Sequence, residues 1–120
     1  MANLEEARRL LQHSLVIDPN YARSYAALSN ICVAAWANPA HEDSLKPSVL
    51  ELAHDSARKA VQLDRNLPLA HAALGWVLSY KHQHDASIAA FEKAVSLNPS
   101  YVDWHFGVAL IRAGESKNGD

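Results

Sequence analysis

The fold is decided by residues 68–101, which read PLAHAALGWVLSYKHQHDASIAAFEKAVSLNPSY. Two alanine-rich apolar runs are separated by His82-Gln83-His84, and the second run ends at Asn98-Pro99. Alanine is the best helix former, whereas proline stops a preceding helix because it lacks a backbone N–H and clashes with the turn before it. The stretch is therefore predicted to form two helices joined by a tight turn, over residues 68–81 and 84–97.

The composition extends this prediction to the whole chain of 120 residues. Alanine occurs 21 times, threonine is absent and there are only four glycines. Glycine and β-branched residues disfavour helix, so their scarcity favours it. An all-α chain with small residues at close helix contacts is expected.

The pattern of residues 68–101 recurs along the chain, at shifts of 46 and 34 residues. One set of positions belongs to the second helix of each pair, which we call the second-type helix. Its columns are Ala7/Ala53/Ser87, Leu11/Ala57/Phe91, Ser14/Ala60/Ala94, Leu15/Val61/Val95 and Ile17/Leu63/Leu97. A set in the first helix, the first-type helix, recurs at the same shifts. Its columns are Tyr25/His71/His105, Leu28/Leu74/Val108, Ser29/Gly75/Ala109 and Ile31/Val77/Ile111.

This repeating unit resembles the tetratricopeptide repeat, a 34-residue pair of helices. The residues that carry the resemblance are Leu74, Gly75, Phe91, Ala94 and Pro99. Ser87 replaces the small alanine that is usual in the family, and His82 stands where the family has a turn glycine. The resemblance covers nearly the whole chain. It implies a short right-handed superhelix of about six antiparallel helices.

The chain is also similar to tetratricopeptide segments attached to bacterial class III adenylate or guanylate cyclases. That resemblance rests on Leu74-Gly75-Trp76-Val77, Gln83-His84-Asp85, Ser87-Ile88-Ala89 and Leu97-Asn98-Pro99. Such segments also occur in transcription regulators and sugar transferases. If the chain came from such a cyclase, the catalytic domain would lie outside it. The repeat segment would then position or regulate that domain.

Six helices are predicted, over residues 3–17, 21–36, 48–64, 68–81, 84–97 and 101–113. They form a single array over residues 1–120, in which two full repeats are flanked by two halves. The parts are a half repeat 3–20, a repeat with an insertion 21–67, a repeat 68–101, a half repeat 102–114 and a frayed tail 115–120. Because the array opens and closes in mid-repeat, the chain is expected to be part of a longer protein.

The insertion falls between the two helices of the first full repeat, at residues 36–47. Loops of repeat proteins often carry function. The alternative is a rigid, proline-bounded turn with Trp36 packed inward. The sequence leaves both interpretations open.

Charge and composition exclude several classes of protein. A net charge of −2 gives no basic field for nucleic acid, and one cysteine, Cys32, cannot form an intramolecular disulfide. No apolar run approaches the length of a membrane span, and the first residues show no signal-peptide pattern. No nucleic acid and no membrane is expected as a partner, and a cytoplasmic location is predicted.

No pattern in the chain indicates catalysis, a cofactor or a metal. His82-Gln83-His84-Asp85 is the densest histidine cluster, but it lacks a second cluster at metal-ligand spacing, so His84 or Asp85 is expected near a helix N-cap. Cys32 is expected to be a small buried residue, and His71 and His105 to be partly buried aromatic spacers between repeats. The carboxylates of Glu5-Glu6 and Glu42-Asp43 are placed in surface contexts. We therefore expect no enzyme activity.

The family resemblance implies that partners bind on the concave face, which the first-type helices line. The residues predicted to form this groove are Arg23, Asn30, Leu69, Trp76, Ser79, Tyr80, Phe106 and Leu110. Aromatic anchors suit an extended or helical peptide of another protein. Some family members grip a chaperone carboxylate with Lys, Arg and Asn, but Asp103 would repel it here. The alternative for Trp76 is packing against neighbouring helices.

The alternative function is homo-oligomerisation through the incomplete terminal repeats or by a domain swap. The last helix of one chain would dock beside the first helix of another, in a head-to-tail contact. The residues expected to meet are Leu4, Leu11, Leu15, Val108, Leu110 and Ile111.

Overall fold

The computed structural model of the protein describes residues 4–101, which contain five α-helices, one short 3-10 helix and no strand. These elements are α1 (Leu4–Ile17), α2 (Ala22–Ala37), α3 (Pro47–Leu63), α4 (Pro68–Tyr80), α5 (His84–Leu97) and η1 (Pro99–Tyr101). The predicted all-α fold is confirmed for this part of the chain, with helix ends within one residue of expectation. The predicted sixth helix, residues 101–113, falls outside the described residues except for Tyr101.

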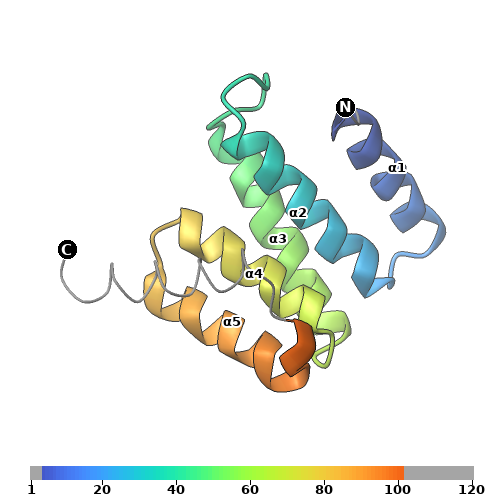
Figure 1. Cartoon of the computed structure of the whole chain (residues 1–120). Coiled ribbons are helices and arrows are strands. Elements are labelled where there is room, and N and C mark those ends of the chain that lie inside the picture. The colour runs from blue at the N-terminus through green and yellow to red at the C-terminus, as the bar shows by residue number, and fades with distance from the viewer. Residues whose placement is uncertain (1–3, 102–120) are drawn as a thin grey trace.

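The helices are arranged as two hairpins with a fifth helix at one end (Figure 1). α2 packs along α3, and α4 packs along α5. The hairpins meet because α4 also packs against both α2 and α3, whereas α1 packs chiefly against α2. Each helix is thus covered by its neighbours in the stack, as in repeat proteins generally. The right-handed superhelix stays a prediction.

The three turns between repeats share one local structure. In each, an Asp or Asn side chain just after a second-type helix accepts a hydrogen bond from the backbone N–H two residues later. The pairs are Asp18 with Asn20 at 3.2 Å, Asp64 with Asn66 at 3.0 Å and Asn98 with Ser100 at 3.1 Å. These side chains cap backbone groups at each turn, and the recurrence shows that the sequence repeat is also a structural one.

Within each hairpin, small residues let the helices approach closely. Ala53, Ala57, Ala60 and Ala94 are fully buried, as predicted. The approach is especially close at Gly75, where an added Cβ atom would lie 2.7 Å from the ring of the buried Phe91. Ser87, also fully buried, donates a hydrogen bond of 2.9 Å to the Gly75 carbonyl oxygen. The serine that replaces the family's alanine therefore links the two helices at their closest point.

Among the residues that the structure describes, two other than glycine adopt a left-handed backbone conformation, and both end a turn between the helices of a hairpin. His82 has φ of 62° between α4 and α5, and Leu45 has φ of 59° between α2 and α3. This conformation brings the Cβ atom too close to the carbonyl oxygen, at a cost of roughly 1–2 kcal/mol. It explains why the family prefers glycine at the position of His82. The N-cap of α5 is Gln83, and His84 and Asp85 follow it in the first turn, so the expectation that they lie near a helix N-cap is confirmed.

The insertion is a compact loop over residues 38–46. Its ends are drawn together because the Leu45 N–H donates to the carbonyl oxygen of Trp36 at 2.9 Å. Asn38 accepts a hydrogen bond from the N–H of Ala40 at 3.0 Å, and Pro47 begins α3, where its missing N–H costs nothing. Trp36 is half-buried against the core. This arrangement agrees with the interpretation of the insertion as a rigid, proline-bounded turn.

Replacing Gly75 with alanine tests the close approach of α4 and α5. The added methyl group collides with the Phe91 ring, so we expect the Gly75→Ala variant to lose about 1–3 kcal/mol of unfolding free energy. Helix propensity alone would stabilise it by about 1 kcal/mol. Urea unfolding measures the change. A second measurement in a Phe91→Leu background should show a smaller cost, and an equal cost in both backgrounds would contradict the contact.

Replacing His82 with glycine tests the left-handed turn. Glycine adopts this conformation without strain, so we expect the His82→Gly variant to gain about 0.5–1 kcal/mol and a higher Tm. The matched control is Ala86→Gly, at an exposed position inside α5, which should lose about 1 kcal/mol. Thermal unfolding followed by circular dichroism distinguishes the two. A His82→Gly variant as destabilised as the control would refute the argument.

Candidate functional site

The predicted groove residues within the described chain lie on one side of α2 and α4, which we call the α2–α4 face. It comprises Arg23, Asn30, Leu69, Trp76, Ser79 and Tyr80. All six side chains are at least partly accessible. The small residues between them, such as Ala26 and Ala72, are buried. The face thus presents large side chains above a floor of alanines, while Phe106 and Leu110 fall outside the described residues.

Two pairs of aromatic rings fix the geometry of this face. Trp76 is half-buried and meets Phe91 edge-on, with ring centroids 5.6 Å apart. Tyr80 meets Trp36 in the same manner at 5.3 Å, so the ends of α2 and α4 are held side by side. Trp76 therefore packs on its neighbouring helix and is still accessible to a partner on its other side. The interpretation of Trp76 as a residue that packs against a neighbouring helix is confirmed, and its role in binding a partner stays a prediction.

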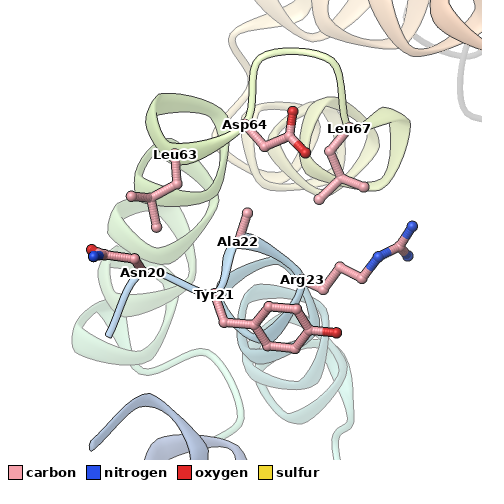
Figure 2. A pocket seen from close by; sticks show the side chains of 7 residues that line it. All are labelled: Asn20, Tyr21, Ala22, Arg23, Leu63, Asp64 and Leu67. Atoms are coloured by element: carbon pink, nitrogen blue, oxygen red, sulfur yellow. The ribbon is translucent and has the colours of Figure 1, made fainter. Parts of the chain in front are cut away.

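A pocket of about 250 Å³ opens where the start of α2, the end of α3 and the start of α4 meet (Figure 2). Ala22, Leu63 and Leu67 supply its apolar wall, and polar groups come from the residues around them. The full lining is Asn20, Tyr21, Ala22, Arg23, Leu63, Asp64 and Leu67. Arg23 belongs to both the pocket and the α2–α4 face. A cavity of this size suits a single side chain of a partner better than a cofactor.

Sequence reasoning missed this pocket, because its walls come from three helices whose relative placement is not encoded in local pattern. One sequence signal could have indicated the pocket. The turns Asp18–Asn20 and Asp64–Asn66 have the same pattern, which brings Asn20 and Asp64 to the same end of the array. The opposite charges of Arg23 and Asp64 give the pocket a polar rim above an apolar wall.

A buried carboxylate ties the insertion to α1. Asp43 is almost fully buried and receives bonds from Arg8 of α1 at 3.1 Å and from Lys46 at 3.2 Å. The prediction that Asp43 lies in a surface context is therefore wrong. Burial acts to raise the pKa of the Asp43 carboxyl, but the hydrogen bond and charge of Lys46, with the charges of Arg8 and His41, outweigh it and hold that pKa below its ordinary value.

A second polar cluster joins α3 to the end of α4. Lys81 donates to Glu51 at 2.7 Å and to Nδ1 of His54 at 2.9 Å. The hydrogen bond and charge of Lys81 lower the pKa of Glu51. Burial lowers the pKa of His54, and the nearby charges of Lys81 and Arg58 lower it further. His54 is thus half-buried and hydrogen-bonded, although its pairing with Asp55 in the sequence suggests a solvated side chain.

The remaining singled-out residues occupy structural positions. Cys32 is fully buried, as predicted. His71 is buried too, and its Nε2–H donates to the carbonyl oxygen of Arg65 at 2.8 Å, which anchors the turn before α4. Among residues 4–101, no three His, Cys, Asp or Glu side chains are arranged to hold a metal ion. The ring centroids of His82 and His84 lie 5.9 Å apart at the turn between α4 and α5.

The residues predicted for self-association separate into two groups. Leu11 and Leu15 are half-buried on α1, and Leu15 packs against the core that α2 and α3 share. Leu4 begins α1. Val108 and Ile111, like Leu110, lie outside the described residues. Three large apolar side chains of α1, those of Leu10, Val16 and Ile17, are exposed, and the sequence did not single them out for self-association.

Comparison with known proteins identifies one repeat directly. Residues 69–101 match the tetratricopeptide repeat. Over 115 residues, or 94% of the chain, the sequence is 29% identical to the transcriptional regulator HilA of Salmonella typhimurium and, to the same degree, of Salmonella typhi. The chain spans only 20% of the length of these relatives. The similarity to cyclase-attached segments stays a prediction.

Within the described part of the chain, no helix has both the length and the apolar character needed to cross a membrane.

The lowered pKa of the half-buried His54 predicts how the free energy of unfolding depends on pH. Its folded-state pKa lies below 6.5, so its contribution to stability is complete above pH 6.5 and is lost as the pH falls through the folded-state value. The lowered pKa values of Glu51 and Asp43 add losses below pH 4.5 and 3.8. We expect urea unfolding to show a first decline below pH 6.5 and a second in stronger acid. His54→Gln should remove the first decline only.

The matched control is His13→Gln, at an exposed position of α1, which should leave both declines unchanged. An equal pH profile in wild type and His54→Gln would contradict the assignment of the first decline to His54.

Proposed function

We propose that this chain is a non-catalytic protein-interaction module whose α2–α4 face binds an extended or helical peptide of another protein. The proposal starts from the tetratricopeptide repeat at residues 69–101, because helical repeats of this kind build surfaces for binding other proteins. The observation that carries it is the chemistry of the face. Arg23, Trp76 and Tyr80 are accessible above buried alanines, and Arg, Trp and Tyr dominate the binding energy of protein interfaces.

The pocket beside Arg23 supports this proposal. It lies at one end of the α2–α4 face and has room for one side chain of a bound peptide. The Arg23 guanidinium can pair with a carboxylate of the peptide, while Leu63 and Leu67 contact apolar atoms. A partner with an acidic group next to an apolar side chain therefore fits best.

The similarity to HilA indicates the kind of protein in which the module would act. HilA is named as a transcriptional regulator, and this chain aligns to a fifth of its length. We place the chain, as part of this proposal, in a longer cytoplasmic regulatory protein in which it supplies an interaction surface. A transcriptional regulator suits this similarity better than a cyclase does.

Selection from a displayed peptide library, followed by calorimetry, tests the binding face. A peptide selected on the wild-type chain should lose at least tenfold in affinity for the Arg23→Glu and Leu69→Glu variants, because each places a charge where the peptide lies. Lys59→Glu, an exposed change on α3, is the matched control and should bind as wild type does. Selected peptides that bind all three variants equally would refute the proposed face.

A further inference from the structure

Two side chains of opposite charge line the pocket between the starts of α2 and α4. Arg23 lies in the first turn of α2, and Asp64 directly follows α3. Both residues are exposed, and within residues 4–101 neither forms an ion pair with another side chain. Figure 2 shows the Arg23 side chain extending away from the Asp64 carboxylate. The two charges therefore do not neutralise each other, and both are available to a ligand.

The turn that contains Asp64 does not require its charge. Oδ1 of Asp64 accepts a hydrogen bond from the backbone N–H of Asn66 at 3.0 Å. In the next turn of the array, Asn98 accepts the N–H of Ser100 at 3.1 Å with an uncharged side chain. An amide oxygen therefore suffices for this turn. The negative charge of Asp64 is left to interact with other groups at the pocket.

The space between the two charges fits a short piece of peptide. A pocket of 250 Å³ is roughly 8 Å across, which two or three residues of an extended peptide span at about 3.3 Å each. Ala22, Leu63 and Leu67 supply its apolar wall, and in Figure 2 the Leu67 side chain lies between the two charged groups. An apolar side chain of a peptide can thus occupy the pocket while its neighbours reach Arg23 and Asp64.

We propose that this pocket binds a peptide segment in which an apolar side chain lies between an acidic residue and a basic residue. The acidic residue pairs with Arg23, and the basic residue pairs with Asp64. The pocket lies at one end of the α2–α4 face, so this assignment rests on the proposed function. It adds a requirement for a positive charge in the partner, and it makes Asp64 the residue that selects for that charge.

Charges at both sides of the pocket discriminate between partners. A peptide with only acidic residues brings a like charge to Asp64, and one with only basic residues brings a like charge to Arg23. A peptide laid in the reverse direction does both. The pair of charges therefore fixes the direction of the bound segment as well as its composition.

The first test compares the peptides that the wild-type chain and the Asp64→Asn variant select from a displayed library of random peptides. Peptides selected on the wild type should carry an acidic and a basic residue within about three residues of each other, around an apolar residue. Peptides selected on Asp64→Asn should keep the acidic and apolar residues and lose the preference for a basic one. Asparagine keeps the turn, as Asn98 shows.

Asp18→Asn is the matched control for this selection. Asp18 makes the same turn bond, to the N–H of Asn20 at 3.2 Å, but it does not line the pocket. Selection on this variant should give the wild-type pattern. The same sequence pattern from the wild type and Asp64→Asn would overturn the proposal, and so would a pattern that changes equally with Asp18→Asn.

The second test is a double-mutant cycle measured by calorimetry. A peptide selected on the wild type is compared with a version in which glutamine replaces its basic residue, against both the wild type and Asp64→Asn. Either change alone should weaken binding about threefold to tenfold, and the loss should shrink as salt is added. The two changes together should cost no more than one, because both remove the same ion pair. Losses that simply add would overturn the proposal.

Circular dichroism and the Tm of Asp64→Asn show that its fold is intact. If the variant lacks the helical signal of the wild type, Asp64→Ser takes its place with the same expected outcomes, because serine also supplies a side-chain oxygen to the turn.

The proposed function and the role of Asp64 fail in different ways. Peptides that lose affinity for Leu69→Glu but bind Asp64→Asn as they bind the wild type would leave the α2–α4 face in place and refute the role of Asp64. Peptides whose binding depends on Asp64 but not on Leu69 would support the pocket and refute the rest of the face. A library that yields no binding peptide would overturn both.

Discussion

The close approach of first-type and second-type helices is the constraint on which the rest of the structure depends. At Gly75 and Phe91 the two helices are so near that no Cβ atom fits between them, and the Ser87 hydroxyl is tied to the Gly75 carbonyl at the same point. Alanines serve the same purpose on α3. A helix packed this closely buries one face against its partner and must bury another against the next pair. Stability is therefore a property of the stack, as in other repeat proteins.

That constraint also determines where the chain can bind other molecules. Trp76 and Tyr80 each contact an aromatic ring of a neighbouring helix on one side and remain at least partly accessible on the other. The polar clusters of Arg8 with Asp43 and of Lys81 with Glu51 lock the ends of neighbouring helices without occupying that face. These groups fix the helices that carry the α2–α4 face, and such preorganisation would reduce the entropy cost of the binding that we propose for it.

The sequence predicted the helices well because local chemistry decides them. Alanine-rich runs, the Asp and Asn side chains at the turns and Pro47, Pro68 and Pro99 fix the helix ends within one residue. The anomaly at His82 was also visible, since the repeat resemblance puts a glycine there and the backbone has φ of 62°. These features depend on neighbours along the chain, so one sequence suffices to find them.

Features that join distant segments could not be predicted in this way. Arg8 and Asp43 are 35 residues apart, and nothing in either local pattern indicates that they meet. Asp43 looked like a surface carboxylate because its burial is created by the fold of the insertion. The choice of Leu11 and Leu15 for self-association followed the apolar repeat columns, which mark the buried side of α1. The exposure of Leu10 on α1 depends on how the helices pack, which no local pattern contains.

Hydrogen exchange of the dilute chain, followed by mass spectrometry, tests the central claim most directly, namely that each helix is held by its neighbours in the stack. α3 lies between α2 and α4, whereas α1 is covered chiefly by α2 and leaves its other side open. The account predicts that backbone amides of α1 exchange through local opening, well before those of α3. Equal protection of α1 and α3 in dilute solution would contradict it, because α1 would then be held by contacts that the stack does not provide.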